Sequence, residues 1–396
     1  MFLKKLSVIF AAAIVTASAM AFTVSAASYV KINEKNFPDE IFREYVAKNF
    51  DSDGDGKLSE QEILSVERIN VRNNVIKSIK GVEYFTELKY LNCEHNNIEE
   101  FDITKNTKLR SFSCGKNVVP ELDVSKNTEL ERLDCYGCGL TKLDVSKNTK
   151  LTYLACYHND LKKINVTKNT ELRSLFCENN EFTSLDLSKN TELTSLSCAD
   201  NYLKTLDVSK NKKLIDLLCE NNELTSLNVR GNTKLDRLRF SDNQIKSIDL
   251  SKNKELTEIR CANNQLTSLD VSKNPKLFEL NCPNNLLKGL DLSKNKGLMQ
   301  LYCEGNKLTS LSVVPNDFIT FKCSNNKFVI SAAVGEKYDL SKLEKYGFDP
   351  KKASNWSGAE YDKKTNTIKI KSKTITYSYD AGGYTAKFTL IAASKK

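Results

Sequence analysis

Apolar residues recur at fixed intervals along most of this chain, and the interval itself predicts the architecture. Between Leu88 and Phe328 the pattern repeats every 21 residues, in twelve units. The unit that begins at Leu193 reads LTSLSCADNYLKTLDVSKNKK and contains two similar halves, L-x-x-L-x-C-x-x-N and L-x-x-L-D-V-x-x-N. A fixed period of this length is typical of a solenoid, in which similar units stack because none can bury its apolar residues alone.

Each half of the unit predicts a local structure of its own. The L-x-C and L-D-V segments predict short strands whose alternate side chains point inward. Asparagine recurs at two positions per unit, where we expect it to satisfy backbone groups of turns from inside the coil. The first set is Asn96, Asn117, Asn159, Asn180, Asn201, Asn222, Asn243, Asn264, Asn285, Asn306 and Asn326, and the second runs from Asn106 to Asn316. Residues 66–87 form a 22-residue variant of the unit, with Val71 in the cysteine position.

These repeats resemble the leucine-rich-repeat family, and within it the bacterial subclass built from two nested half-repeats. The resemblance covers residues 66–330 and rests on many copies of the same motif. It implies a mostly β fold, with a solenoid as its main body. It also implies a function in binding through an extended surface.

The N-terminus predicts a secretory signal peptide at residues 1–26. Lys4 and Lys5 precede an uncharged apolar stretch from Leu6 to Phe22, and Val24-Ser25-Ala26 fits the small-residue rule for a cleavage site. The alternative is a membrane anchor, but the apolar stretch is at the lower limit of length for a span and is rich in alanine. We therefore expect a protein that is secreted or held at the cell surface and does not span a membrane after cleavage.

Cysteine occupies one position of nearly every unit. The positions are Cys93, Cys114, Cys135, Cys156, Cys177, Cys198, Cys219, Cys261, Cys282, Cys303 and Cys323. Twelve cysteines in a secreted protein first suggest disulfides. However, Val71 and Phe240 occupy the same position in other units, which indicates a small buried apolar residue, so we expect free thiols. Cys138 stands at an asparagine position and completes a C-x-x-C motif with Cys135, but it lacks the strand-to-helix context of a redox site.

Residues 51–62, DSDGDGKLSEQE, match the twelve-residue calcium loop of an EF-hand. The predicted ligands are Asp51, Asp53, Asp55, the Lys57 carbonyl, Ser59 through water, and bidentate Glu62. Residues 37–50 are expected to form the entering helix. Because the loop occurs once and lies just before the repeats, we expect calcium to act as a structural clamp that holds a helical cap on the first unit.

The chain after the repeats has a different pattern and a different charge. Residues 367–371, 374–379 and 384–391 alternate polar and apolar residues, which predicts a small β cap, and residues 339–346 suggest a short helix. Residues 351–396 carry ten lysines against three acids, whereas residues 27–350 are neutral overall. A basic tail either binds anionic wall polymers or membranes or simply keeps the surface solvated. The predicted organisation is a signal peptide at 1–26, an EF-hand cap at 27–65, the solenoid at 66–330 and a β-rich cap at 331–396.

The sequence offers little for catalysis. Its two histidines, His95 and His158, both lie two residues after a cysteine, a surface position of the repeat, and no nucleophile, phosphate-loop or zinc motif is present. A neutral repeat body without a basic stripe also argues against nucleic-acid binding. We therefore expect a binding protein and not an enzyme.

The outward positions of the first half-unit vary from unit to unit, whereas those of the second half repeat Asp, Ser or Thr, and Lys. The variable positions carry residues that are common in binding hot spots. They are Arg132, Tyr136, Tyr153, Tyr157 and Phe176 in one group and Arg237, Arg239 and Arg260 in another. These residues predict a surface for an extracellular protein, and the alternative ligand is a glycan or cell-wall polymer.

Overall fold

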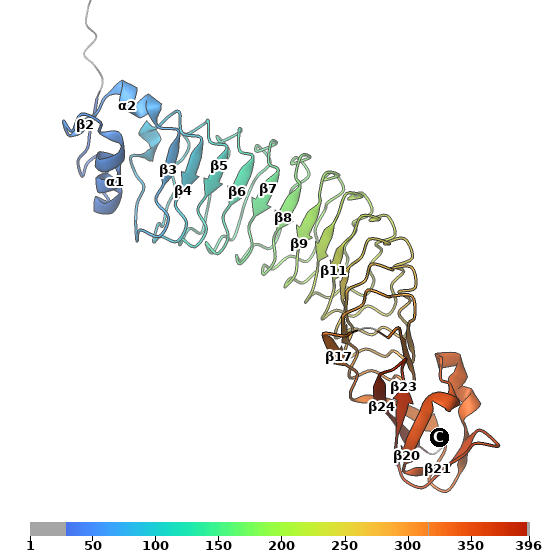
Figure 1. The fold of residues 1–396 in the computed structure, drawn as a ribbon. Helices are drawn as coiled ribbons and strands as arrows, with labels where there is room; N and C mark the ends of the chain where they lie inside the picture. The colour runs from blue at the N-terminus through green and yellow to red at the C-terminus, as the bar shows by residue number, and fades with distance from the viewer. Residues whose placement is uncertain (1–28, 316, 394–396) are drawn as a thin grey trace, which may run out of the picture.

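The computed structural model describes residues 29–315 and 317–393, so the predicted signal peptide lies outside the described residues. The molecule is a curved solenoid with a small helical cap at its N-terminal end and a β cap at its C-terminal end (Figure 1). In the described parts of the chain, no helix is long and apolar enough to cross a membrane. The mostly β solenoid predicted from the repeats is confirmed.

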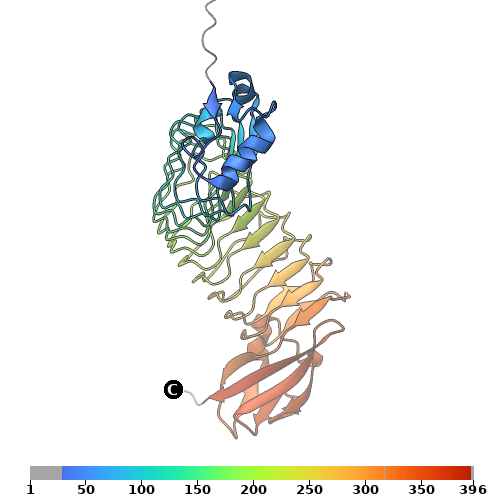
Figure 2. The ribbon, with the colours of Figure 1, turned by 90° about the vertical axis from the view of Figure 1, so that its left-hand side faces the viewer.

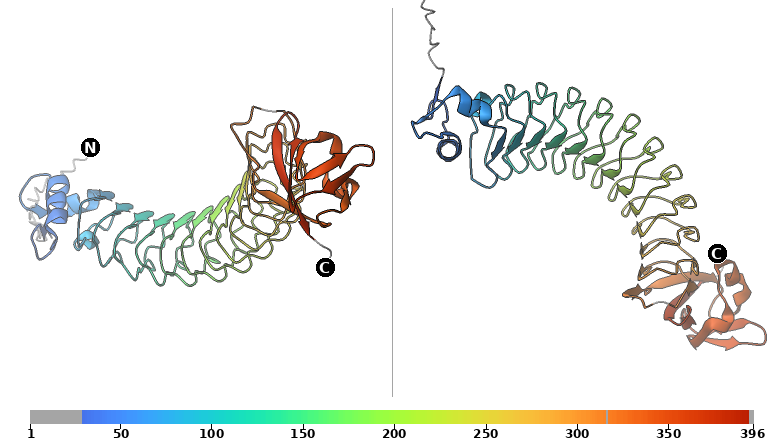
Figure 3. Two further views of the ribbon diagram at one scale, coloured as in Figure 1. Left: turned by 90° about the horizontal axis from the view of Figure 1, so that it is seen from below. Right: turned by 45° about the horizontal axis from the view of Figure 1, so that its top comes forward.

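A parallel sheet of thirteen short strands forms the body of the solenoid. Its strands are β3 (Arg68–Asn70), β4 (Tyr90–Asn92), β5 (Ser111–Ser113), β6 (Arg132–Asp134), β7 (Tyr153–Ala155), β8 (Ser174–Phe176), β9 (Ser195–Ser197), β10 (Asp216–Leu218), β11 (Arg237–Arg239), β12 (Glu258–Arg260), β13 (Glu279–Asn281), β15 (Gln300–Tyr302) and β17 (Thr320–Lys322). Most neighbours pair with an offset of one repeat, as Leu217 does with Leu238. Figure 2 shows these strands as one row along the solenoid, and Figure 3 places them on the inner side of the curve. We call this inner side the concave face, and one turn of the solenoid a rung.

The second half of each unit differs from the prediction. Within the described residues, only two L-x-L or L-x-V segments of this half form strands, β14 (Leu290–Leu292) and β16 (Leu311–Val313). The inward residues are nevertheless buried, as Leu206 and Val208 are. In most rungs the central aspartate accepts the N–H two residues further on, as Asp207 does from Ser209 at 2.9 Å. The backbone therefore turns directly after this segment, and it does so even at β14, where Asp291 accepts the N–H of Ser293 at 2.9 Å.

The two asparagine positions form buried ladders along the solenoid. In the first ladder, Asn201 donates from Nδ2 to the carbonyls of Cys177 and Cys198, both at 3.2 Å, and its Oδ1 accepts the N–H of Phe182 at 3.0 Å. In the second ladder, Nδ2 donates to two carbonyls of the preceding rung, but Oδ1 has no hydrogen-bond partner among the described residues from Asn106 to Asn295. Both ladders thus satisfy turn carbonyls from inside the coil, and Asn316 lies outside the described residues.

The residue two positions after each cysteine position adopts a left-handed backbone conformation. These residues are His95, Lys116, Gly137, His158, Asn179, Asp200, Asn221, Asp242, Asn263, Asn284, Gly305 and Asn325, with φ between 50° and 69°. Asparagine, aspartate and glycine tolerate this conformation best, which explains why they dominate the position. The two histidines therefore occupy turn positions at the surface.

All twelve cysteines are buried and none forms a disulfide. Burial raises the pKa of cysteines at the repeated position, such as Cys177 and Cys282, well above the usual value for a thiol. At Cys138 the thiol donates to the carbonyl of Cys114 at 3.2 Å, in place of an asparagine amide. It offers no Oδ1 to the preceding rung, so Val119 donates its N–H to the backbone carbonyl of Cys138 at 2.9 Å.

The N-terminal cap closes the first rung. It comprises β1 (Val30–Lys31), α1 (Glu40–Phe50), β2 (Lys57–Leu58) and α2 (Glu60–Ser65), and a 3-10 turn, η1 (Val82–Tyr84), follows in the first repeat. Asp39 caps α1 through the N–H of Phe42 and also accepts the N–H of Lys77 in the first rung at 2.8 Å. The hydroxyl of Tyr45 accepts the N–H of Asn70 at 3.2 Å. These contacts fix the helix on the end of the solenoid.

The C-terminal cap contains two small sheets. One has the order β18 (Asn326–Ser331), β24 (Thr385–Ala393), β23 (Thr374–Asp380) and β20 (Ala353–Ser357), and the other β19 (Lys337–Asp339), β22 (Thr367–Ile370) and β21 (Ala359–Asp362). Two 3-10 helices, η2 (Leu340–Tyr346) and η3 (Pro350–Lys352), connect them. Because β18 begins at Asn326, the cap sheet starts within the last repeat and overlaps the predicted boundary at residue 331.

Candidate functional sites: the concave face and the calcium loop

The acidic loop of the N-terminal cap brings three predicted metal ligands together. One carboxylate oxygen each from Asp51, Asp53 and Asp55 lies within 4.8 Å of the others. Asp51 is held by the N–H groups of Gly54 and Gly56, at 2.9 and 3.0 Å. Gly56 has φ of 78°, a conformation that suits glycine and allows the sharp turn of the loop.

Glu62 closes the loop from the first turn of α2. One carboxylate oxygen accepts the N–H and hydroxyl of Ser52, both at 2.6 Å, and the other accepts those of Ser59, both at 2.8 Å. These hydrogen bonds, led by the Ser52 hydroxyl, lower the pKa of Glu62 to about 2, so it is charged. Lys57 lies in β2, and its ammonium contacts Asp55 at 3.0 Å. The three clustered aspartates offer the charged oxygen donors that a hard cation such as Ca²⁺ takes, whereas Glu62, held by Ser52 and Ser59, is not part of this cluster.

The first predicted binding group forms one connected patch on the concave face, which we call the aromatic patch. It consists of Arg132, Tyr136, Tyr153, Tyr157 and Phe176, on and just after β6, β7 and β8. The rings of Tyr136 and Tyr157 stack at 4.6 Å between centroids, with an interplanar angle of 13°. The guanidinium carbon of Arg132 lies 3.5 Å from the centroid of Tyr153, and Tyr153 contacts Phe176 at 5.5 Å. The structure thus brings all five residues together.

Small neighbours make room for these rings. A Cβ on Gly115 would lie 2.4 Å from the ring of Tyr136, so this ring packs directly on the backbone of the preceding rung. Tyr157 covers Tyr136 from the following rung, and the Tyr136 hydroxyl is hydrogen-bonded to Nε2 of His95 at 3.0 Å. The patch is therefore held in a fixed geometry before any partner binds.

A buried carboxylate, which the sequence analysis missed, lies within the patch. Asp134 is only 6% exposed, and its Oδ2 accepts a hydrogen bond from Arg132 at 3.2 Å. Its Oδ1 has no hydrogen-bond partner in the described parts of the chain. Burial, and then the charge of Glu94, raise the pKa of Asp134 to about 6. Burial and the charge of Asp134 in turn raise the pKa of Tyr157 to about 12.

The arginines of the second predicted group are paired with acids on neighbouring rungs. Arg237 contacts Asp216 at 2.6 Å. Glu258 lies between Arg239 and Arg260, with both contacts at 2.7 Å, and Arg260 also contacts Glu279 at 3.0 Å. This group lies on β11 and β12, separated from the aromatic patch by β9 and β10. The three arginines and their three acidic partners form a charge-neutral network. The offset of 21 residues between Asp216 and Arg237 is the sequence signal from which this pairing could have been predicted.

Comparisons with known proteins agree with this geometry. No protein-family model matches the chain. Internalin J of Listeria monocytogenes is 38% identical over 71 residues, which are 18% of this chain and 8% of that protein. The solved functional domain of InlJ from the same species, described as including a cysteine ladder, aligns with a TM-score of 0.62 at 26% identity and covers 94% of this chain and 100% of that one.

Two further structures share the fold. The internalin InlF of L. monocytogenes aligns with a TM-score of 0.60 at 22% identity, over 72% of this chain and 94% of that one. A leucine-rich-repeat protein of Leptospira interrogans aligns with a TM-score of 0.58 at 18% identity, over 68% and 86%. Together with the stacked repeats, these likenesses show that the chain has a leucine-rich-repeat fold similar to that of these bacterial proteins.

Proposed function

We propose that this protein is secreted or displayed at the cell surface and binds another protein through the aromatic patch on its concave face. The observation that carries the proposal is the convergence of three tyrosines, a phenylalanine and an arginine from successive rungs into one rigid surface. Large aromatic side chains and arginine supply most of the binding energy in many protein interfaces. Because the patch is already fixed by its own contacts, little conformational entropy is lost on binding.

The geometry favours a protein over a glycan at this patch. Sugars bind aromatic residues through an open ring face, but one face of Tyr136 lies on Gly115 and the other on Tyr157. A face of Tyr153 is covered by Arg132. The ring edges remain for contact, and these suit the mixed polar and apolar surface of a protein.

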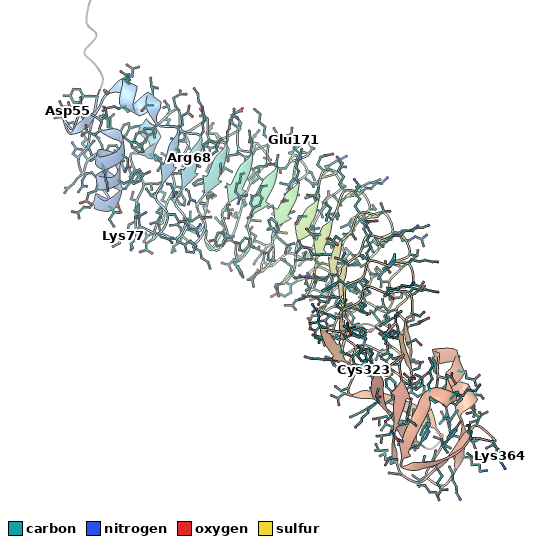
Figure 4. All side chains as sticks on the ribbon, viewed as in Figure 1. Asp55, Arg68, Lys77, Glu171, Cys323 and Lys364 are labelled. Carbon is teal, nitrogen blue, oxygen red and sulfur yellow. The ribbon has the colours of Figure 1, made fainter. Side chains whose placement is uncertain are left out.

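Calcium binding by the loop at residues 51–62 is the second part of the proposal. The loop is continuous with α1 and α2, and α1 carries Asp39 and Tyr45, which contact the first rung. A bound ion would neutralise the clustered aspartates and hold the two helices in place. Its role is structural, at the end of the solenoid far from the C-terminal cap (Figure 4).

The test of the binding surface compares two double variants. The full-length mature protein is immobilised and exposed to solubilised surface proteins, and the captured proteins are identified. Tyr153→Ala with Phe176→Ala should weaken capture of the specific partner at least tenfold, about 1.4 kcal/mol. Lys147→Ala with Lys189→Ala, which changes two exposed residues of the repetitive second half, is the control. If the lysine pair weakens binding more than the aromatic pair, the concave face is not the binding surface.

A further inference from the structure

A separate pocket of about 420 Å³ lies on the C-terminal cap. It is lined by Pro350, Lys351, Ala353, Tyr361, Lys363 and Asn366. The pocket is formed where η3 and the start of β20 meet the turn between β21 and β22. This turn lies at the C-terminal extremity of the molecule, beside Lys364 (Figure 4). Its volume is within the range of small-molecule sites.

An aromatic stack forms one wall of the pocket. Tyr361 stacks on Trp356 at 5.8 Å between centroids with an angle of 29°, and Trp356 stacks on Tyr377 at 4.6 Å with an angle of 22°. Tyr377 is buried and donates from its hydroxyl to the carbonyl of Thr309 at 2.7 Å. The ring of Tyr361 is therefore supported from behind by the core of the cap. A rigid aromatic ring at the edge of a pocket is suited to contact with the C–H face of a sugar.

The positive charge around the pocket indicates that its ligand carries a negative charge. Lys351 and Lys363 form no ion pair in the described parts of the chain, whereas nearby Lys371 contacts Glu360 at 3.0 Å. The surrounding segment, residues 351–396, has ten lysines and three acids. Two unpaired ammonium groups beside a supported aromatic ring suit an anionic group on a polyhydroxylated molecule.

We propose that this pocket binds an acidic sugar unit of a polysaccharide or polyol polymer, with a carboxylate or a phosphate as its anionic group. The sugar face lies on Tyr361, and the acid group pairs with Lys351 and Lys363. The site is independent of the concave face. The protein would then hold a polymer at its C-terminal end while the aromatic patch remains free for its protein partner.

Trp356 is the single tryptophan of the chain, and its ring stacks on Tyr361, which lines the pocket. The full-length mature protein is titrated with tetragalacturonate, with oligomeric glycerol phosphate and with neutral maltotetraose while tryptophan fluorescence is followed. A saturable change with at least one acidic oligomer, and at least tenfold weaker binding of maltotetraose, would support the proposal. The acidic oligomer that binds more tightly identifies the anionic group as carboxylate or phosphate. No change with either acidic oligomer, or equal binding of the neutral one, would overturn it.

Two matched variants separate the pocket from general charge attraction. Lys351→Ala with Lys363→Ala should weaken binding at least tenfold, whereas Lys369→Ala with Lys373→Ala, which removes the same charge outside the pocket, should change it less than threefold. Equal losses would show that the basic surface, and not the pocket, attracts the polymer. The concave-face variant Tyr153→Ala with Phe176→Ala should titrate like the wild type, so failure of one proposal leaves the other testable.

Discussion

Asp134 shows how neighbouring side chains change the character of a single residue. In the repeat pattern it occupies an outward strand position, where a charged residue would normally be solvated. Here Arg132 contacts it, tyrosines of the same and the next rung surround it, and only 6% of the residue remains exposed. Its chemistry is therefore decided by its environment and not by its position in the repeat.

The raised pKa of Asp134 gives the stability of the protein a pH dependence with a definite sign. Its pKa is about 6 in the folded state, against 3.8 as the ordinary value. The folded state therefore binds more protons between these values, so the contribution of this residue to stability increases as the pH falls from 7 to 4. Two pKa units correspond to about 3 kcal/mol. Asp134→Asn should remove this component, which urea unfolding of both proteins at pH 7 and pH 4.5 would measure. A stability difference between variant and wild type that is the same at both pH values would contradict it.

The cysteines behave as buried apolar residues with unreactive thiols. We predict that thiol titration in denaturant without a reductant finds close to twelve free thiols, and that the native protein reacts very slowly. Burial raises the pKa of thiols such as Cys177 and Cys282, and only the thiolate reacts readily. The hydrogen bond with Cys114 lowers the pKa of Cys138 instead, but this thiol is also buried. A count below half of twelve would indicate a disulfide scaffold instead.

At the scale of the element, the asparagine ladders decide how one rung continues into the next. The first ladder is satisfied at both Oδ1 and Nδ2, whereas the second uses Nδ2 alone. The same residue type at two positions of one repeat therefore contributes different amounts to stability. Position Cys138 shows that a rung survives without the asparagine when the backbone supplies the missing acceptor.

We predict that Asn201→Ala lowers the free energy of unfolding by about 1–3 kcal/mol, because it leaves the buried N–H of Phe182 without a partner. The carbonyls of Cys177 and Cys198 keep the amides of Asn180 and Asn222 as donors. Asn211→Ala should cost less, because the carbonyls of Leu187 and Asn190 keep their backbone N–H donors and the change removes an oxygen that has no partner among the described residues. Urea unfolding of the two variants tests the order. Equal costs would mean that the Oδ1 contact of the first ladder contributes nothing.

Calcium should stabilise the N-terminal cap. At a concentration one hundred times its dissociation constant, a ligand that binds only the folded state adds about 2.7 kcal/mol. We predict that calcium raises the melting temperature, that chelation lowers it, and that Asp51→Ala or Glu62→Gln abolishes the difference. Glu60→Gln, an exposed residue of the same helix, is the control and should keep the response. An unchanged melt after verified removal of calcium would rule out the clamp.

At the scale of the whole molecule, the solenoid depends on caps that cover its two ends. The C-terminal cap contacts the last rungs through Ser310, whose hydroxyl donates to the carbonyl of Tyr346 at 2.7 Å, and through the Val313 N–H, which donates to Ala381 at 2.9 Å. Gly289 lies at this junction, where a Cβ would approach the Tyr346 carbonyl to 2.0 Å. The cap therefore docks only because the repeat lacks a side chain at this position.

Gly289→Ala should loosen the C-terminal cap, because the Tyr346 backbone must move to accept a methyl group. We expect a lower melting temperature and faster tryptic cleavage between the solenoid and the cap. Gly231→Ala is a matched control, since the nearest atom to its Cβ, the Ser209 carbonyl oxygen, is 3.7 Å away. Cleavage of both variants at the rate of the wild type would show that the junction adapts without cost.

The sequence by itself determined the solenoid, because a period of 21 residues places each apolar residue and each asparagine opposite its equivalent in the next rung. It also located the aromatic patch, since residues one period apart must lie side by side. The grouping of the three loop aspartates followed in the same way, from spacing within a short segment.

Only the tertiary structure decided which charged side chains form ion pairs and which are buried by their neighbours. The arginines of β11 and β12 are neutralised by Asp216, Glu258 and Glu279, and Asp134 is enclosed by residues of two rungs. The second half of the repeat forms turns in place of most predicted strands, and the C-terminal pocket joins residues from η3, β20 and the turn after β21. These features depend on side-chain directions and on contacts between segments with no common period. A repeat pattern therefore fixes the frame of this molecule, whereas its local electrostatics and its caps depend on contacts that the period does not describe.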